Sequence, residues 1–374
     1  MNPLPLHEFH HSLSARFGEL NGAEIVSHYG DVPAEHAALR EHAGVLDLSF
    51  RSRICLTGAD RVRFLHGQVT NDVKRLKTGE GCYAALTTAK GKMESDLNIC
   101  VLPDELLLDF EPGLTEKISQ RLEKYIVSDD VQVVDVAPHY GLLSVQGPKA
   151  EAVVKALGVF PELPGKPLQS VKVSDAMLGE IHLVGQSRIP GSAGVPPASS
   201  MINGFDLFVP TNSLGAVADK LIAAAKSVGG RACGWDALEI ARIEAGIPRF
   251  GADMDETNIP LECDIEARAV SYSKGCYIGQ EVINRIHSIG HVNKELRGLQ
   301  LADDLKSLPV KGDKLFRDGK EIGYVTSATK SPTLKANLAL GYIRREVNAP
   351  GTELILRTTT GETKALISEL PFLK

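Results

Sequence analysis

Residues 274–281 read Lys-Gly-Cys-Tyr-Ile-Gly-Gln-Glu, the stretch from which the fold of the chain can be assigned. Its two glycines, Gly275 and Gly279, stand four positions apart, and glycine lets the backbone turn tightly and approach a ligand closely. A helix is predicted to begin near Gly279, with an apolar face made of Val282, Ile283 and Ile286. Its first N–H groups would attract an anion, and Lys274 adds positive charge upstream. The pattern predicts a site for a carboxylate or phosphate ligand, or else a glycine-rich turn before an ordinary helix.

Positive charge gathers in the region that follows. Between residues 274 and 297 there are four Lys or Arg and two Glu, so this region carries +2 in a chain whose net charge is −6. Cys276 lies two positions after Lys274, and a nearby cation can lower the pKa of a thiol and make it reactive. Most lone cysteines are instead small buried hydrophobes, so both interpretations of Cys276 stay open.

A second candidate site lies in residues 89–96, which read Ala-Lys-Gly-Lys-Met-Glu-Ser-Asp and are predicted to form a hairpin. Alternate side chains of a strand share a face, so Glu94 and Asp96 are predicted to be neighbours while Ser95 points the other way. A carboxylate pair can serve in acid–base chemistry, although a solvated strand face is the commoner explanation.

The composition places the chain among globular proteins. Its 374 residues are 43% hydrophobic and 24% charged, which predicts about two or three domains. A net charge of −6 is not typical of a nucleic-acid binder. No apolar run approaches the roughly 20 residues that cross a bilayer. The first residues lack the basic start and apolar run of a secretory signal, so we expect a cytoplasmic protein.

Cysteine and histidine spacing predicts no metal site. The six cysteines include no Cys-x-x-Cys pair, and the two nearest, Cys263 and Cys276, are 13 positions apart. His287 and His291 stand four apart, but Gly290 lies between them and no carboxylate ligand is near. A disulfide framework belongs to short secreted chains and is not expected here.

The pattern of apolar residues changes along the chain. Short predicted strands at 53–56, 83–86 and 106–110 are mixed with helices, which indicates an α+β class. The Pro-, Gly- and Ser-rich stretch 190–200 is predicted to be a surface loop. From about residue 295 helical periodicity fades. Two hairpin signals appear there, Asp318-Gly319 and Thr360-Gly361, and they favour a small antiparallel β-barrel or sandwich.

Residues 274–281 resemble the signature of the YgfZ-type folate-binding proteins, which are relatives of the glycine-cleavage T-protein. The similarity extends over roughly residues 30–370. Four further stretches resemble the wider T-protein superfamily: 39–47, 70–73, 242–248 and 255–261.

The resemblance implies an α+β fold in which three domains form a ring around a central channel. The first would span 1–140, with 231–290 packing back on it. The second would span 141–230 and carry the insertion 190–200. These two have ferredoxin-like α+β cores, and 291–374 would form a C-terminal antiparallel β-barrel. Tetrahydrofolate or a derivative would lie in the channel.

The same resemblance implies the site residues. Lys274 and Cys276 would carry the chemistry at the edge of the channel, with Lys274 holding the Cys276 thiolate ionised. The expected folate contacts are Tyr83, Asp96, Gly275, Tyr277, Gly279, Gln280, Glu281 and Arg285, and no metal ligand is expected.

Two departures from the T-protein pattern bear on function. In the aminomethyltransferases of this superfamily, the resemblance implies, the first Asp of an Ile-Asp-Asp-Leu stretch is catalytic. The matching stretch here, residues 94–97, reads Glu-Ser-Asp-Leu, so Ser95 takes that place and Asp96 remains. The Gly-Tyr-Thr-Gly-Glu loop is absent, and the insertion stands in its place. Losing a carboxylate that polarises the reacting amine would greatly slow aminomethyl transfer.

We therefore expect a folate-binding accessory factor for assembly or repair of iron–sulfur clusters in client enzymes, including radical enzymes that modify tRNA. One alternative is a folate-dependent aminomethyltransferase of the glycine cleavage system, disfavoured by Ser95. Another is a non-catalytic scaffold that binds proteins or RNA, although the negative net charge disfavours RNA. Whether the protein is an enzyme stays open. The expected partners are folate and iron–sulfur clients or assembly factors, with no membrane and a monomeric state.

Overall fold

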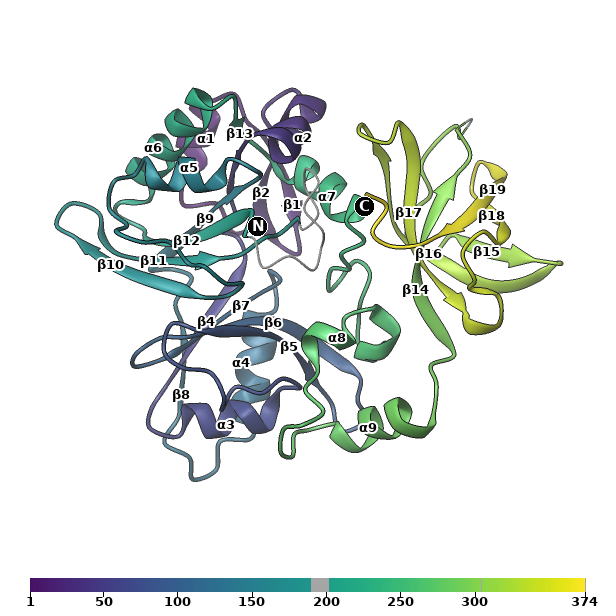
Figure 1. The fold of residues 1–374 in the computed structure, drawn as a ribbon, viewed down its shortest axis with the longest axis horizontal. Helices are drawn as coiled ribbons and strands as arrows, with labels where there is room; N and C mark the ends of the chain where they lie inside the picture. Colours follow the sequence, from purple (N-terminus) through teal and green to yellow (C-terminus); the bar gives the residue numbers. More distant parts are fainter. Residues whose placement is uncertain (190–201, 304, 374) are drawn as a thin grey trace.

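The computed structural model describes residues 1–189, 202–303 and 305–373. Within these ranges a five-stranded sheet, a six-stranded sheet and a closed barrel are arranged around a common centre (Figure 1). The predicted α+β class with a C-terminal antiparallel barrel is confirmed. The loop predicted at 190–200 lies outside the described residues.

The five-stranded sheet has the order β5-β6-β7-β4-β8. Its strands are β4 (Ser52–Thr57), β5 (Gly81–Thr87), β6 (Met93–Val101), β7 (Leu106–Phe110) and β8 (Gln132–Asp135). Helices α3 (Arg61–Gln68) and α4 (Thr115–Glu123) cover one face, where Leu65 and Ile118 pack on Leu97 and Leu108. Burying that face leaves the opposite one directed toward the centre of the molecule.

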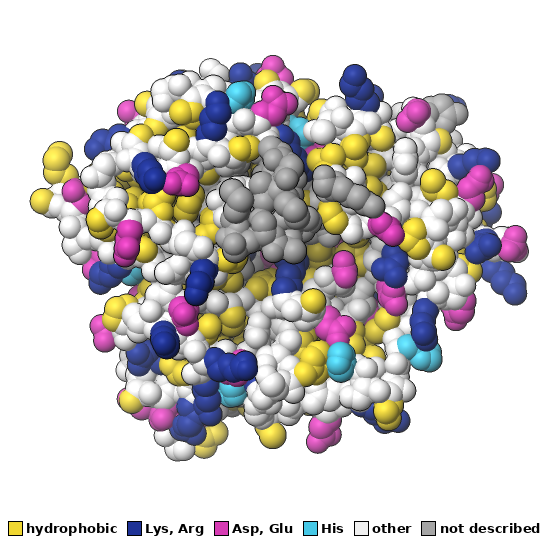
Figure 2. Space-filling model, viewed as in Figure 1, with side chains coloured by type: hydrophobic (Ala, Val, Ile, Leu, Met, Phe, Trp, Pro, Cys, Tyr) yellow, Lys and Arg dark blue, Asp and Glu magenta, His cyan; other side chains and the backbone are white. Residues whose placement is uncertain are grey.

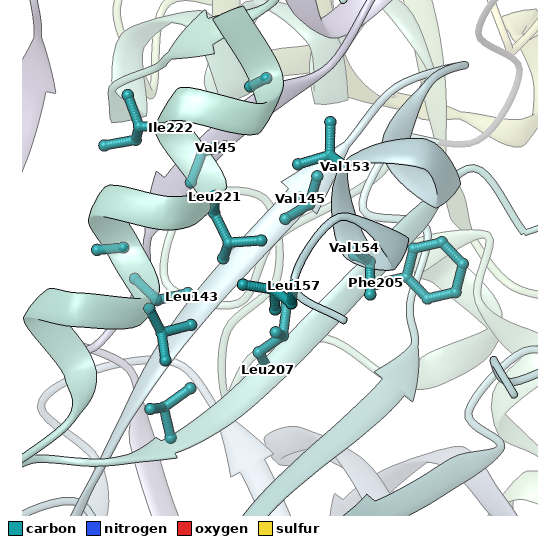
Figure 3. Close-up of a cluster of buried hydrophobic side chains, with 14 of the residues drawn as sticks. Val45, Leu143, Val145, Val153, Val154, Leu157, Phe205, Leu207, Leu221 and Ile222 are labelled. Carbon is teal, nitrogen blue, oxygen red and sulfur yellow. The ribbon is translucent and has the colours of Figure 1, made fainter. Parts of the chain in front are cut away.

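The six-stranded sheet has the order β10-β11-β12-β9-β3-β13. Its strands are β3 (Gly44–Asp47), β9 (Tyr140–Gln146), β10 (Ser170–Asp175), β11 (Gly179–Gly185), β12 (Gly204–Pro210) and β13 (Arg231–Ala232). Helices α5 (Ala150–Lys155) and α6 (Leu214–Ser227) pack on it. Figure 3 shows Leu221 of α6 and Val154 of α5 over Leu143 and Leu207 of the sheet.

The sheet memberships bear on the expected domain limits. β3 pairs with β9 and, in parallel, with β13, so the second sheet takes strands from both sides of 141–230. The limit at residue 140 coincides with the first residue of β9. The strands of the five-stranded sheet are therefore inserted in sequence between β3 and β9 of the six-stranded sheet.

The remaining elements lie outside the two sheets and the barrel. They are α1 (His7–Ser12), β1 (Arg16–Leu20), β2 (Ala23–His28), α2 (Val32–Glu41), α7 (Trp235–Glu244), the 3₁₀ turn Pro260–Cys263, α8 (Glu266–Ala269) and α9 (Gln280–Ile289). Among them, α7 packs on barrel strands β16 (Lys320–Ser331) and β17 (Ala336–Arg344). β1 and β2 form a hairpin. α2 packs on α7, and Figure 1 shows α7, α8 and α9 running between the sheets and the barrel.

The barrel closes in the order β14-β17-β16-β15-β18-β19. Its strands are β14 (Lys294–Leu301), β15 (Lys314–Arg317), β16 (Lys320–Ser331), β17 (Ala336–Arg344), β18 (Glu353–Thr358) and β19 (Gly361–Ser368), with a 3₁₀ turn at Arg345–Val347. Both predicted hairpins are confirmed, since Asp318-Gly319 joins β15 to β16 and Thr360-Gly361 lies at the turn from β18 to β19.

Candidate functional site

A cavity of about 570 Å³ lies between the two sheets and α7. Cavities of this size are typical of small-molecule sites. Its wall combines apolar surface with charge, and the residues that matter most are Tyr83, Asp96, Glu111, Arg188, Trp235, Leu238, Glu239, Arg242, Arg249 and Arg268. Strands β5 and β6 supply one side and α7 the other, so the cavity depends on how the chain folds back on itself.

Asp96 is the carboxylate that β6 directs into this cavity. The Tyr83 hydroxyl on β5 donates a 2.9 Å hydrogen bond to Asp96 Oδ2. Burial raises the pKa of Asp96, and the nearby charge of Glu111 raises it further, against the lowering effect of the Tyr83 hydrogen bond. A carboxyl with a raised pKa in a cavity is a candidate for proton transfer.

Ser95 lies on the other side of β6. Its side chain is completely buried, and its hydroxyl donates to the backbone oxygen of Asp96 at 3.0 Å. It is not part of the cavity wall. The expectation that Ser95 replaces the reacting carboxylate is therefore wrong for this geometry, because a carboxylate at position 95 would face away from the cavity.

The predicted pairing of Glu94 with Asp96 is also wrong. The register of β5 and β6 shifts between Leu86 and Thr87, which breaks the alternation of side chains on β6. Glu94 accepts a 2.7 Å hydrogen bond from Nε of Arg121 on α4. Asp96 thus faces the cavity without Glu94.

Four arginines of the cavity wall form ion pairs with carboxylates of the protein. Arg51, for example, donates to Asp109 at 2.8 Å and to Glu111 at 2.6 Å. The other three, Arg188, Arg242 and Arg249, pair with Asp206, Asp253 and Glu111 respectively. Arg268 differs: within the described ranges it makes no ion pair, and its guanidinium lies 4.7 Å from the centre of the Tyr83 ring. It is the wall cation that an anionic ligand can use.

The 274–281 segment lies beside the cavity and not in its wall. Lys274 is 7% exposed, and its ammonium donates to the backbone oxygens of His66, Val69 and Asn71 at 2.5, 2.6 and 2.9 Å. Asn71 is itself a wall residue. The Lys274 ammonium is thus bound to carbonyls rather than directed at Cys276.

The other predicted contacts in this segment also lie outside the wall. Cys276 is exposed, whereas Tyr277 is buried and its hydroxyl has no hydrogen-bond partner among the described residues. Gly279 is the N-cap residue of α9 and has φ +91°. The remaining predicted contacts, Gly275, Gln280, Glu281 and Arg285, are exposed or half-buried. Of the expected folate contacts, only Tyr83 and Asp96 line the cavity.

The side chains that could bind a metal are scattered among the described residues. No three His, Cys, Asp or Glu side chains gather there as metal ligands. His287 instead pairs with Glu266 at 2.6 Å and stacks on Tyr272, while His291 lies beyond the end of α9. No helix in those ranges has the length and apolarity needed to span a membrane. Figure 2 shows acidic and basic side chains interspersed over the visible face.

Sequence reasoning did not identify Arg51, Arg188, Trp235 or Arg268 as wall residues. One usable signal was the run Leu106–Phe110, in which Asp109 interrupts a buried apolar strand. A buried acid needs a cation, and Arg51 supplies it. No local pattern marked Arg268 or Trp235.

Comparison with known proteins gives full-length matches. The family model of the GCVT N-terminal domain matches residues 6–274, and that of the glycine cleavage T-protein C-terminal barrel domain matches 294–374. A protein of Halalkalibacterium halodurans named aminomethyltransferase is 29% identical over 371 residues, covering 99% of this chain and 97% of the relative. One of Geobacillus sp. (strain WCH70), with the same name, is 28% identical over 371 residues and covers 99% and 98%.

A solved structure has the same fold. The glycine cleavage system aminomethyltransferase T from Bartonella henselae superposes with a TM-score of 0.87 at 25% identity, covering 99% of this chain and 98% of the other.

Proposed function

The chain belongs to the glycine cleavage T-protein family, and from that premise we propose that it binds tetrahydrofolate in the central cavity and transfers a one-carbon unit of the aminomethyl type. The observation that carries the proposal is the position of Asp96, a carboxyl with a raised pKa held in the cavity by Tyr83. The relatives named aminomethyltransferase support the same reaction class.

The wall residues fit a folate. A folate joins a flat heterocycle to a chain that ends in carboxylates. Trp235, Leu238 and Tyr83 offer flat or apolar surface, and Arg268 offers a cation with no ion pair among the described residues. Apolar walls with a few placed polar groups are typical of such sites. We expect the heterocycle near Asp96 and the carboxylates near Arg268.

The chemical role proposed for this chain is proton transfer by Asp96. Tetrahydrofolate supplies the amine that accepts the one-carbon unit. As that amine formed its bond to the one-carbon unit, the bond from the same carbon to the sulfur of the donor would break. The Asp96 carboxylate would take the proton that the amine releases, and the donor sulfur would leave as a thiol after taking up a proton. The negative charge of Asp96 also stabilises positive charge on the reacting nitrogen. Tyr83, by its hydrogen bond, holds Asp96 in one orientation.

A second candidate is the folate-binding accessory factor for iron–sulfur proteins. The observation that favours it is Cys276, the exposed cysteine of the segment that resembles the YgfZ signature. Lys274 and Tyr277 on either side of it are buried, so the thiol is presented at the surface. In this function the bound folate would not need to react at Asp96. A client protein would contact Cys276.

The test combines binding with turnover. Tetrahydrofolate is titrated anaerobically by calorimetry, and transfer is measured with an aminomethylated lipoyl carrier protein. The transferase proposal predicts turnover that falls by at least about 100-fold in Asp96→Asn. Ser95→Ala is the matched control and should keep its activity, since Ser95 faces the core.

Other outcomes separate the two functions. Folate binding without turnover, together with loss of iron–sulfur client activity in Cys276→Ser, would favour the accessory factor. No folate binding by a folded sample would overturn both.

A further inference from the structure

The Lys274 ammonium sits in a cage of the protein's own backbone. Its three N–H groups meet three carbonyl oxygens, those of His66, Val69 and Asn71, at 2.5–2.9 Å. Its nitrogen lies 4.8 Å from the centre of the Tyr277 ring. His66 is in the last turn of α3, where free carbonyls carry partial negative charge. A buried lysine with all its donors used is fixed in place.

Two of the carbonyls bound by Lys274, those of Val69 and Asn71, belong to the turn 69–72, which is hydrogen-bonded to residues of the cavity wall. In this turn the Asn71 side-chain amide donates to the backbone oxygens of Tyr83 at 2.8 Å and Arg268 at 3.0 Å. Next to it, the Thr70 hydroxyl donates to the oxygen of Ala269 at 2.6 Å. Residues 69–72 thus connect β5 to the start of the 274–281 segment.

We propose that Lys274 is a positioning residue of the cavity: it fixes the turn 69–72, and through Asn71 it sets where Tyr83 and Arg268 face the ligand. The Lys274 ammonium donates to the backbone oxygen of Asn71. The Asn71 amide in turn donates to the backbone oxygens of Tyr83, which contacts Asp96, and of Arg268, which is expected to bind the ligand anion. This assigns Lys274 a role that does not involve Cys276. The affinity readout of its test rests on the proposed folate binding.

Protonation of Lys274 gives the proposal a pH signature. Burial lowers its pKa to about 8. The titratable groups that face it are Asp72, Cys82, Lys74, His66 and Tyr277. Above pH 8 the neutral amine has two N–H groups for three carbonyls. One carbonyl then loses its donor, so the turn loosens and ligand affinity falls as the pH rises.

The experiment measures binding of 5-formyltetrahydrofolate, an air-stable folate, from pH 6.5 to 9.5. Trp235 is the single tryptophan of the chain and lies in the wall, so its fluorescence reports occupancy. Lys274→Met removes the donors at nearly constant size. Lys77→Met removes an exposed lysine of the same loop and is the matched control.

We expect Lys274→Met to weaken binding by at least about tenfold at pH 7, and to abolish the fall in affinity near pH 8. Lys77→Met should keep both the affinity of the wild type and its fall in affinity near pH 8. Asn71→Ala should also abolish the fall in affinity near pH 8. The double variant Asn71→Ala/Lys274→Met should lose less binding affinity than the sum of the losses in the two single variants. If Lys274→Met does not fold, Asn71→Ala still decides the pH prediction.

Two results would overturn the proposal: a folded Lys274→Met that binds like the wild type, or a fall in affinity near pH 8 that persists in it. If the wild type binds no folate, the proposed function fails, and hydrogen exchange decides the role of Lys274 separately. Amides in 69–72 and 81–87 should then exchange faster in Lys274→Met than in Lys77→Met. Equal exchange in the two variants would overturn the positioning role.

Discussion

The hydroxyl of Tyr83 donates to Oδ2 of Asp96 across two paired strands, at 2.9 Å. The pairing places Tyr83 opposite Asn98, so Asp96 is its diagonal neighbour on the cavity face. The strand register therefore selects Asp96, and not Ser95 or Glu94, as the carboxyl that the tyrosine can reach. A one-residue slip would direct a different side chain into the cavity.

Asp96→Asn should stabilise the protein at neutral pH while it removes activity. Folding raises the pKa of Asp96 above its ordinary 3.8, because burial disfavours the charged form. The wild type therefore loses stability as the pH rises from 3.8 through the raised value, where the unfolded chain ionises more readily. Asparagine buries no negative charge, and its side-chain oxygen can still accept the hydrogen bond from Tyr83. We expect a gain of about 0.5–2 kcal/mol at pH 7, measured by urea unfolding.

At pH 3 the same comparison should show little difference, since Asp96 is then protonated in both states. A variant less stable than the wild type at pH 7 would contradict the assigned pKa direction.

Arg51→Met should be strongly destabilising. Arg51 is buried between Asp109 and Glu111, and its removal leaves both carboxylates without that partner inside the protein. Breaking a buried ion pair in this way costs about 3–5 kcal/mol. The exposed Arg63, which pairs with Asp60 and Asp129, is the control. Arg63→Met should leave the denaturant midpoint almost unchanged, and equal losses in the two variants would refute the explanation.

Glu244→Gln should weaken the attachment of the barrel to the sheets. Glu244 on α7 accepts from His36 and Arg40 of α2 and from Ser331 of β16. Burial alone would raise its pKa, but these partners hold it below the ordinary 4.5. Its charge therefore stabilises the fold above pH 4.5, and this contribution disappears as the pH falls through the lowered pKa.

We expect Glu244→Gln to cost about 2–3 kcal/mol at pH 7 and progressively less below pH 4.5. Thermal unfolding of both proteins between pH 3 and 7 measures this. The exposed Glu123→Gln serves as the control and should follow the wild-type curve. Parallel curves for Glu244→Gln and the wild type at all pH values would exclude the charge effect.

Much of the local structure could be predicted because it depends on short-range chemistry. Asp-Gly at 318–319 requires a tight turn, and the turn joins β15 to β16 as expected. The apolar run at 106–110 predicts a strand, and β7 spans Leu106–Phe110. These features need only neighbouring residues.

The candidate site could not be predicted in the same way. Strict alternation paired Glu94 with Asp96, but a register shift opposite Thr87 separates them. Arg268 reaches the cavity because Asn71, far away in sequence, holds its backbone oxygen. Such relations depend on the three-dimensional arrangement of distant segments. The motif at 274–281 was recognised, yet its lysine binds backbone carbonyls, which no spacing in the sequence indicates.

The two glycines of that motif should differ in how much stability they lose on substitution by alanine. Gly279 has φ +91°, and a Cβ there would lie 2.6 Å from the backbone oxygen of Thr88. Gly279→Ala therefore combines an unfavourable backbone conformation with a clash that no side-chain movement relieves. We expect a loss of at least about 1–2 kcal/mol, measured by urea unfolding.

Gly275→Ala is the matched comparison. Among the described residues, a Cβ at Gly275 would meet only the His66 ring, at 3.8 Å, which is an ordinary contact. Its stability should therefore stay close to that of the wild type. Because Gly279 is the N-cap of α9, the Gly279→Ala variant should also exchange the amides of 280–289 faster than Gly275→Ala does. If Gly275→Ala proved the more damaging change, the segment would need its flexibility at the residue before Cys276, and a ligand approaching that backbone would become the better explanation for the glycine.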